Sequence, residues 1–217
     1  MPLEVHDISV PTHAGMLITG AQPEKTTKFS IAAGDEYNVS GWSLHVHTGT
    51  HLETQLHFVE GREPIDEVRA GRLVGPAQVL DLTGVASEEI GPDDLVAAGF
   101  DSAERVLLKT RNSEDIVRRV EKAESWTGLG VPAAEPLRKR GARLIGIDYL
   151  SVETPASEAS GDWPVHNTLC GGGVLLLEMI DLRGIEPGEY LLASLPLRLQ
   201  GSEAAPARTV LIGGVSV

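Results

Sequence analysis

The 217-residue chain has one cysteine, few aromatic residues and no long apolar run. The single cysteine, Cys170, excludes an internal disulfide framework and is typical of a reducing compartment. Because aromatic residues make up only 4% of the chain, we expect a core of leucine, valine and isoleucine. The longest apolar run lies around 174–177 and is far shorter than the ~20 residues that span a bilayer. No membrane-spanning segment is therefore expected.

Positive charge is also scarce. The chain has 18 lysines and arginines against 31 aspartates and glutamates, a formal net charge of −13. This balance excludes nucleic acid and anionic membrane surfaces as expected partners. The first residues have neither a basic start nor an apolar stretch, so no signal peptide is predicted. We therefore expect a cytoplasmic protein that acts on a small molecule.

No repeat, low-complexity tract or linker divides the chain, so residues 1–217 are expected to form one domain. Stretches with strand character interleave with short helical ones, which indicates a mixed α/β fold. One stretch, 38–46, alternates apolar and polar residues and predicts a half-buried strand. The other predicted strands cover 3–10, 77–82, 105–109, 143–147, 174–178, 190–196 and 208–212, and the predicted helices cover 92–98, 113–123 and 136–140.

Four of the seven histidines fall within thirteen residues. Imidazole and carboxylate are ordinary ligands of Zn²⁺ and also suit Mn²⁺ or Fe²⁺. His47, His51 and Glu53 are therefore predicted to bind a metal ion, leaving one coordination position for water. His57 is predicted to be catalytic as a proton shuttle, because an unperturbed imidazole has a pKa near ~6.5.

The cluster is expected at a strand end and in the loop after it. Gly49 follows the predicted strand and disfavours a helix, so we expect a loop that curls around the ion. The alternative is a polar loop whose histidines merely bond to backbone groups.

A second group of candidates lies between residues 163 and 181. His166 follows Pro164, which is well placed at a helix start. Glu178 ends an apolar strand, and a buried carboxylate needs a partner. That partner is either a metal ion or an arginine, such as Arg183 or Arg208.

Residues 47–57 read His-Thr-Gly-Thr-His-Leu-Glu-Thr-Gln-Leu-His. This string resembles the H-x-G-T-H-x-D-x-P-x-H signature of the putative cyclase family, which includes bacterial kynurenine formamidases and isatin hydrolases. Glu53 stands where the family usually has Asp, and Gln55 where it usually has Pro. Further similar elements are Asp7-Ile8-Ser9, Gly146–Ser151, Leu195-Pro196-Leu197 and Pro206-Ala207-Arg208.

The resemblance implies a larger site. The segment around His166 and Glu178 is similar to the family's later H-x-x-L-L-x-x-G-x-x-x-x-E element, whose histidine and glutamate complete the active site. In some members they do so around a second ion, which Glu53 could bridge. The implied fold is a β-barrel-like sheet core with surrounding short helices, assembled as a homodimer or homotetramer. Trp163, close to His166, is the tryptophan expected to bind the substrate.

These features predict a metal-dependent amidohydrolase with one or two divalent ions, Zn²⁺ or Mn²⁺. Metal-activated water would cleave an aryl formamide or a cyclic amide, such as N-formylkynurenine or isatin. A lactonase, or a biosynthetic cyclase or dehydratase, could use the same metal site. The alternative from another class is a metal-binding or ligand-binding protein without turnover.

Overall fold

The computed structural model describes residues 3–118 and 121–214. Seven strands close into a barrel in the order β12-β11-β5-β7-β9-β10-β4, with β4 pairing back onto β12. Their bounds are β4 His51–Glu53, β5 Val74–Asp81, β7 Arg105–Lys109, β9 Leu144–Ile147, β10 Leu175–Glu178, β11 Gly188–Pro196 and β12 Ala204–Gly213. Another strand, β1 (Glu4–Asp7), pairs with residues 210–213 of β12, whereas β4 pairs with residues 204–206 of the same strand. The predicted mixed α/β fold with a barrel-like sheet core is confirmed.

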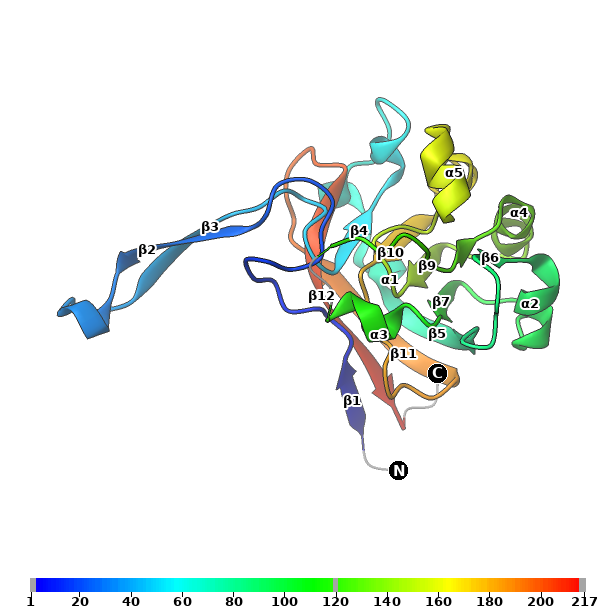
Figure 1. Ribbon diagram of the computed structural model, residues 1–217, viewed down its shortest axis with the longest axis horizontal. Helices are drawn as coiled ribbons and strands as arrows, with labels where there is room; N and C mark the ends of the chain where they lie inside the picture. Colours follow the sequence, from blue (N-terminus) through cyan, green and yellow to red (C-terminus); the bar gives the residue numbers. More distant parts are fainter. Residues whose placement is uncertain (1–2, 119–120, 215–217) are drawn as a thin grey trace.

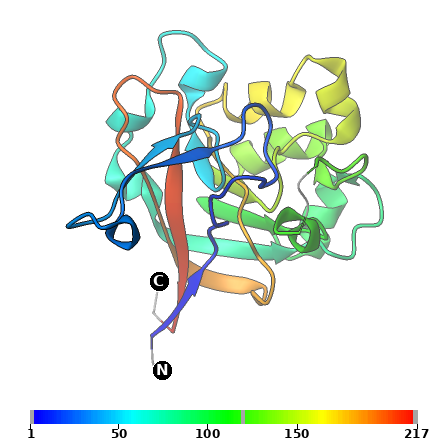
Figure 2. The ribbon, with the colours of Figure 1, turned by 60° about the vertical axis from the view of Figure 1, so that its left-hand side comes forward.

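Helices are short, and those of six or more residues lie on one side of the barrel (Figures 1 and 2). They are α1 Ala70–Leu73, α2 Pro92–Ala97, α3 Ser113–Ile116, α4 Val131–Lys139, α5 Pro155–Ser160 and α6 Pro164–Leu169. Single 3-10 turns occur at Ile31–Ala33 (η1), Gln55–His57 (η2) and Ile65–Glu67 (η3), and a short parallel pair joins β6 (Glu89–Ile90) to β8 (Gly128–Leu129). No helix in the described ranges is long and apolar enough to cross a membrane.

Two apolar layers follow from the alternation of side chains along the barrel strands. One layer fills the barrel interior with residues from all seven strands, including Leu52, Leu107 and Leu177. The other lies outside the barrel beneath α2, α4 and α6, and includes Leu137 and Leu176. Both layers are almost entirely aliphatic, as the composition predicted.

The alternation also places polar groups outside the barrel. On β4, Leu52 belongs to the interior layer, so its neighbours His51 and Glu53 point to the opposite face. On β10, Glu178 shares the outer face with Leu176. The ends of β4 and β10 thus direct three ionisable side chains into one region on the outer face.

A β-hairpin, β2 (Glu24–Phe29) and β3 (Val39–Ser43), projects far from the barrel (Figure 1). The prediction of a half-buried strand over 38–46 is therefore wrong about burial. Trp42 remains 46% exposed and Leu44 39% exposed, because this chain offers the hairpin no core to pack against. The preceding strand, β2, was not predicted, since its residues are all exposed and show no apolar alternation.

The predicted helix over 113–123 is also wrong in length. The helix α3 ends at Ile116, and residues 119–120 lie outside the described ranges. Further on, the backbone N–H of Ala123 donates to the Tyr149 hydroxyl instead of continuing a helix. By contrast, α4 begins at Val131, five residues before the predicted start at 136.

Candidate metal centre and active site

The first candidate group combines a loop, a strand and a 3-10 turn. His47 lies in the loop between β3 and β4, but His51 and Glu53 lie on β4 itself and are buried. The cluster was expected at a strand end and in the loop after it, and the expectation of a loop is wrong for His51 and Glu53. His57 ends η2, whose first turn is capped by the Thr54 side chain accepting from the Leu56 N–H.

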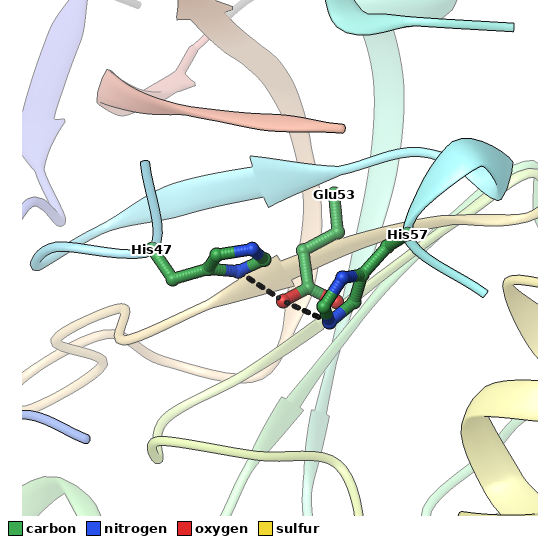
Figure 3. A group of neighbouring side chains, drawn as sticks. All are labelled: His47, Glu53 and His57. Carbon is green, nitrogen blue, oxygen red and sulfur yellow. Dashed lines mark hydrogen bonds and ion pairs between the residues drawn. The ribbon is translucent and has the colours of Figure 1, made fainter. Parts of the chain in front are cut away.

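Glu53 stands at the centre of this group, as Figure 3 shows. Its Oε1 lies 2.7 Å from Nδ1 of His47, 3.2 Å from Nε2 of His51 and 3.9 Å from Nε2 of His57. His47, Glu53 and His57 each offer a ligand atom within 4.8 Å of the others, and so do His51, Glu53 and Glu178. The three histidines that lie close to Glu53 in the sequence thus surround its carboxylate in the structure.

The second candidate group meets the first at the same carboxylate. Nε2 of His166, on α6, lies 3.7 Å from Oε2 of Glu53 and 3.6 Å from Oε1 of Glu178. Nε2 of His51 lies 3.6 Å from Oε2 of Glu178. The structure therefore brings His47, His51, Glu53, His57, His166 and Glu178 together.

Neither of the two arginines considered above is the partner of Glu178. Arg183 pairs with Asp181, and Arg208 pairs with Asp7. Among the described residues, the ion pairs of Glu53 and Glu178 are all with histidines.

Two buried carboxylates in one site perturb each other. Burial raises the pKa of Glu178, and the neighbouring Glu53 charge raises it further. For Glu53 burial acts in the same direction, but hydrogen bonds from His47 and His51 outweigh it and hold its pKa well below the usual range. Burial lowers the pKa of His166, yet contacts with Glu153 and Glu178 raise it to about 10. The site is thus arranged around negative charge that attracts a cation.

The donor set fits a divalent metal ion. Oε2 of Glu53 is buried and has no hydrogen-bond partner within residues 3–118 and 121–214, which is costly unless a cation takes that position. Imidazole nitrogens and carboxylate oxygens are the ligand types of zinc and manganese sites. Cys170 does not contribute as a nucleophile: its buried thiol donates to the Thr54 carbonyl, and burial raises its pKa.

A cavity of about 420 Å³ opens onto these groups. Trp163 and Phe58 line it, and both rings contact His166, with centroids 5.6 Å and 4.8 Å from the imidazole. His57 packs edge-on against Phe58 at 4.6 Å. The predicted substrate-binding residue Trp163 therefore lies in the wall of the same cavity.

Besides Phe58, sequence reasoning missed two carboxylates at this site. Glu153 is completely buried and accepts from Nδ1 of His166 at 3.0 Å, and Glu203 lies 3.4 Å from Nε2 of His47. Neither has a ligand-type neighbour at short spacing that could have identified it. The sequence signal for Glu153 was its place two residues after Ser151, which ends the Gly146–Ser151 element.

Known proteins are similar to this chain over most of its length. A family model described as "Putative cyclase" matches residues 6–154. The chain belongs to this family. Its relatives include the kynurenine formamidase of Salinibacter ruber, 34% identical over 80% of this chain and 79% of the relative. The kynurenine formamidase of Geobacillus thermodenitrificans is 33% identical over 85% of each chain.

Solved structures agree with this assignment. A potential metal-dependent hydrolase with cyclase activity matches with a TM-score of 0.83 and 32% identity over 99% of this chain and 100% of that one. Isatin hydrolase A from Labrenzia aggregata shares the fold, with a TM-score of 0.84 and 20% identity over 97% and 93% of the two chains. The predicted family and the predicted enzyme class, a hydrolase of carbon–nitrogen bonds other than peptide bonds, are confirmed by the relatives.

Proposed function

We propose that this enzyme hydrolyses an aryl formamide of the N-formylkynurenine type with the help of bound divalent metal. The observation that carries the proposal is the convergence of four imidazoles and two buried carboxylates on one aromatic-walled cavity. The names of the relatives support the formamide as substrate. A cyclic amide such as isatin is the second candidate, supported only by a shared fold with isatin hydrolases.

Five residues are proposed to hold the metal. His47, His51 and Glu53 would bind one ion, and His166 and Glu178 would bind a second that shares Glu53. Zinc or manganese suits these donors, and such ions polarise a carbonyl and lower the pKa of water at a protein site.

His57 is proposed to be the residue that carries the proton to the departing nitrogen. Burial is the main reason that its pKa lies below the ordinary value, so the ring is neutral at pH 7 and able to accept a proton. Its side chain is 32% exposed, which leaves it free to exchange that proton with solvent. Its place beside His47 and Glu53 also suits a metal ligand, and this second role is separated from the first by a prediction below.

Trp163 and Phe58 are proposed to hold the aryl group of the substrate. Both line the cavity on the side of His166, and flat apolar rings favour offset or edge contacts with another ring.

The projecting hairpin supports a homo-oligomer, a homodimer or a homotetramer. A two-stranded hairpin alone is marginally stable in water, and β2–β3 exposes Phe29, Ile31, Tyr37 and Trp42. A second copy of the chain would cover these side chains. We also infer one catalytic domain over 1–217 and a cytoplasmic location, the latter because Cys170 is a free thiol.

The test is activity against N-formylkynurenine, formanilide, isatin and an aryl lactone before chelation, after chelation and after addition of Zn²⁺ or Mn²⁺. We expect formamide cleavage to be lost on chelation and restored by one of the ions. The His51→Ala variant should stay inactive in excess metal, whereas His6→Ala, a substitution on β1, should match the wild type. Formamide cleavage that does not change on chelation refutes the proposal. Faster cleavage of the lactone than of the formamide indicates that the enzyme is a lactonase. Stoichiometric metal without turnover of any of these compounds indicates a binding protein.

A further inference from the structure

The segment after β9 contacts both members of the second candidate group. The backbone N–H of Val152 donates to Oε1 of Glu178 at 3.0 Å. The next residue, Glu153, is 0% exposed and reaches His166 with its carboxylate. Two consecutive residues, Val152 and Glu153, thus hydrogen-bond to the side chains of the two predicted metal ligands Glu178 and His166.

The carboxylate of Glu153 also takes the place of a helix cap. Its Oε1 accepts from the backbone N–H of Val165 at 3.0 Å and of His166 at 2.9 Å, which are in the first turn of α6. Such first-turn N–H groups have no partner within a helix. Trp163, the residue before α6, provides no side-chain cap and lies in the left-handed region with φ 49°. Glu153 therefore ties the start of α6 to the segment beneath it.

The same oxygen determines which nitrogen of His166 faces the site. Nδ1 lies 3.0 Å from Oε1 of Glu153, so the Nδ1–H donates to that carboxylate. The other ring nitrogen, Nε2, then faces Glu53 and Glu178, at 3.7 and 3.6 Å. Metal-ligating histidines commonly donate their other ring N–H to a carboxylate, which fixes tautomer and ring direction.

We propose that Glu153 is a positioning residue that selects Nε2 of His166 as a metal ligand and holds the ring in place for it. This inference rests on the proposed function, because it assumes that His166 binds an ion. Glu153 is not among the residues that line the cavity.

Glu153 is itself held from two sides. The indole N–H of Trp126 donates to its carbonyl oxygen at 2.8 Å, and its own N–H donates to Oγ of Ser151 at 3.1 Å. Gly128 packs so closely that a Cβ there would lie 2.3 Å from the Glu153 carbonyl oxygen. On the side-chain end, Oγ of Ser157 donates to Oε2 at 2.7 Å. The carboxylate therefore has little freedom to leave His166.

The first candidate group uses a different acceptor. Nδ1 of His51 donates to the carbonyl oxygen of Gly49 at 2.8 Å, a backbone group that no side-chain substitution removes. Loss of the Glu153 charge should therefore weaken the ion held by His166 and spare the ion held by His47 and His51. This selectivity separates positioning from a general loss of structure.

The experiment is a metal titration of Glu153→Gln, which keeps size and the acceptor oxygen but removes the charge. Zinc binding is followed by competition with a chromophoric chelator. The control is Glu135→Gln, at a half-buried carboxylate on α4 that pairs with Arg138 and does not line the cavity. We expect one ion to bind Glu153→Gln as in the wild type and the other about 10- to 100-fold more weakly. Unchanged affinity for both ions overturns the inference.

A second measurement uses the wild type and does not depend on the variant folding. Nitrogen-15 spectra of the zinc-loaded protein, with His166 assigned by substitution, report which ring nitrogen carries the proton. We expect a protonated Nδ1 and a ligated Nε2, and the opposite tautomer overturns the inference even if the enzyme is active. A wild type that binds no zinc at all overturns the proposed metal site as well, so the two failures are distinguishable.

Discussion

His51 and Glu178 are direct partners in the antiparallel register between β4 and β10. Directly opposite residues of an antiparallel pair point to the same face of the sheet. This register explains why Nε2 of His51 lies 3.6 Å from the Glu178 carboxylate although the residues are far apart in sequence. The site is therefore built on the outer face of the barrel, and the β3–β4 loop, η2 and α6 supply the remaining imidazoles.

The role of His57 is tested by His57→Ala. If the ring shuttles a proton, turnover should fall by about 10²- to 10⁴-fold while the protein keeps its full metal content. Elemental analysis and steady-state kinetics on the same sample separate the two roles. Loss of an ion together with activity would show instead that His57 is a ligand.

The aryl-binding role of Trp163 is tested by Trp163→Ala, with Trp42→Ala on the exposed hairpin as the control. An aromatic contact contributes about 1 kcal/mol, so we expect KM for an aryl formamide to rise roughly fivefold. The KM for formamide itself, which has no ring, should change little. Equal effects on both substrates would contradict ring recognition.

Asp148 gives a prediction for stability against pH. Burial is the main reason that its pKa rises to about 6, despite hydrogen bonds from Thr110 and Ser113. A raised carboxyl pKa means that the folded state retains a proton that the unfolded state has lost. Its contribution to stability is therefore complete below the unfolded pKa near 3.8 and is lost as pH rises through about 6.

The measurement is urea unfolding of metal-free wild type and Asp148→Asn between pH 4 and 7. The difference in unfolding free energy between the two proteins should fall over this range by up to ~3 kcal/mol. A difference that stays constant, or that grows with pH, contradicts the raised pKa.

Gly128 tests the close packing behind Glu153. A Cβ at this position would meet the Glu153 backbone, which cannot move aside as a flexible side chain can. We expect Gly128→Ala to lower the free energy of unfolding by about 1–3 kcal/mol. Gly84→Ala is the matched control, since Gly84 is exposed and a Cβ there meets nothing within 4 Å. Equal unfolding midpoints for the two variants would contradict this packing.

The first group of candidate residues could be picked out of the sequence because its metal-ligand side chains lie close together along the chain. His47, His51 and Glu53 lie within seven positions, and the trailing His57 completes a recognisable string. Their placement was less predictable: the sequence suggested a loop, but the alternation on β4 requires His51 and Glu53 to share one face with Leu52 opposite. Only the register with β10 and β12 makes this segment a strand.

The remainder depended on tertiary contacts. Glu153 acts through α6 and His166, a relation that no local spacing encodes. Likewise, Trp42 and Leu44 alternate as in a half-buried strand, yet the hairpin that carries one of them extends away from the core. Apolar alternation predicts that one face of a strand packs against other apolar side chains. It does not say whether those side chains belong to the same chain.

The most direct test of the metal centre is anomalous scattering from crystals of the protein loaded with zinc. We predict anomalous peaks within bonding distance of Glu53, with His47 and His51 on one side and His166 and Glu178 on the other. The absence of a peak at Glu53 in zinc-loaded crystals, or a peak elsewhere only, would contradict the account.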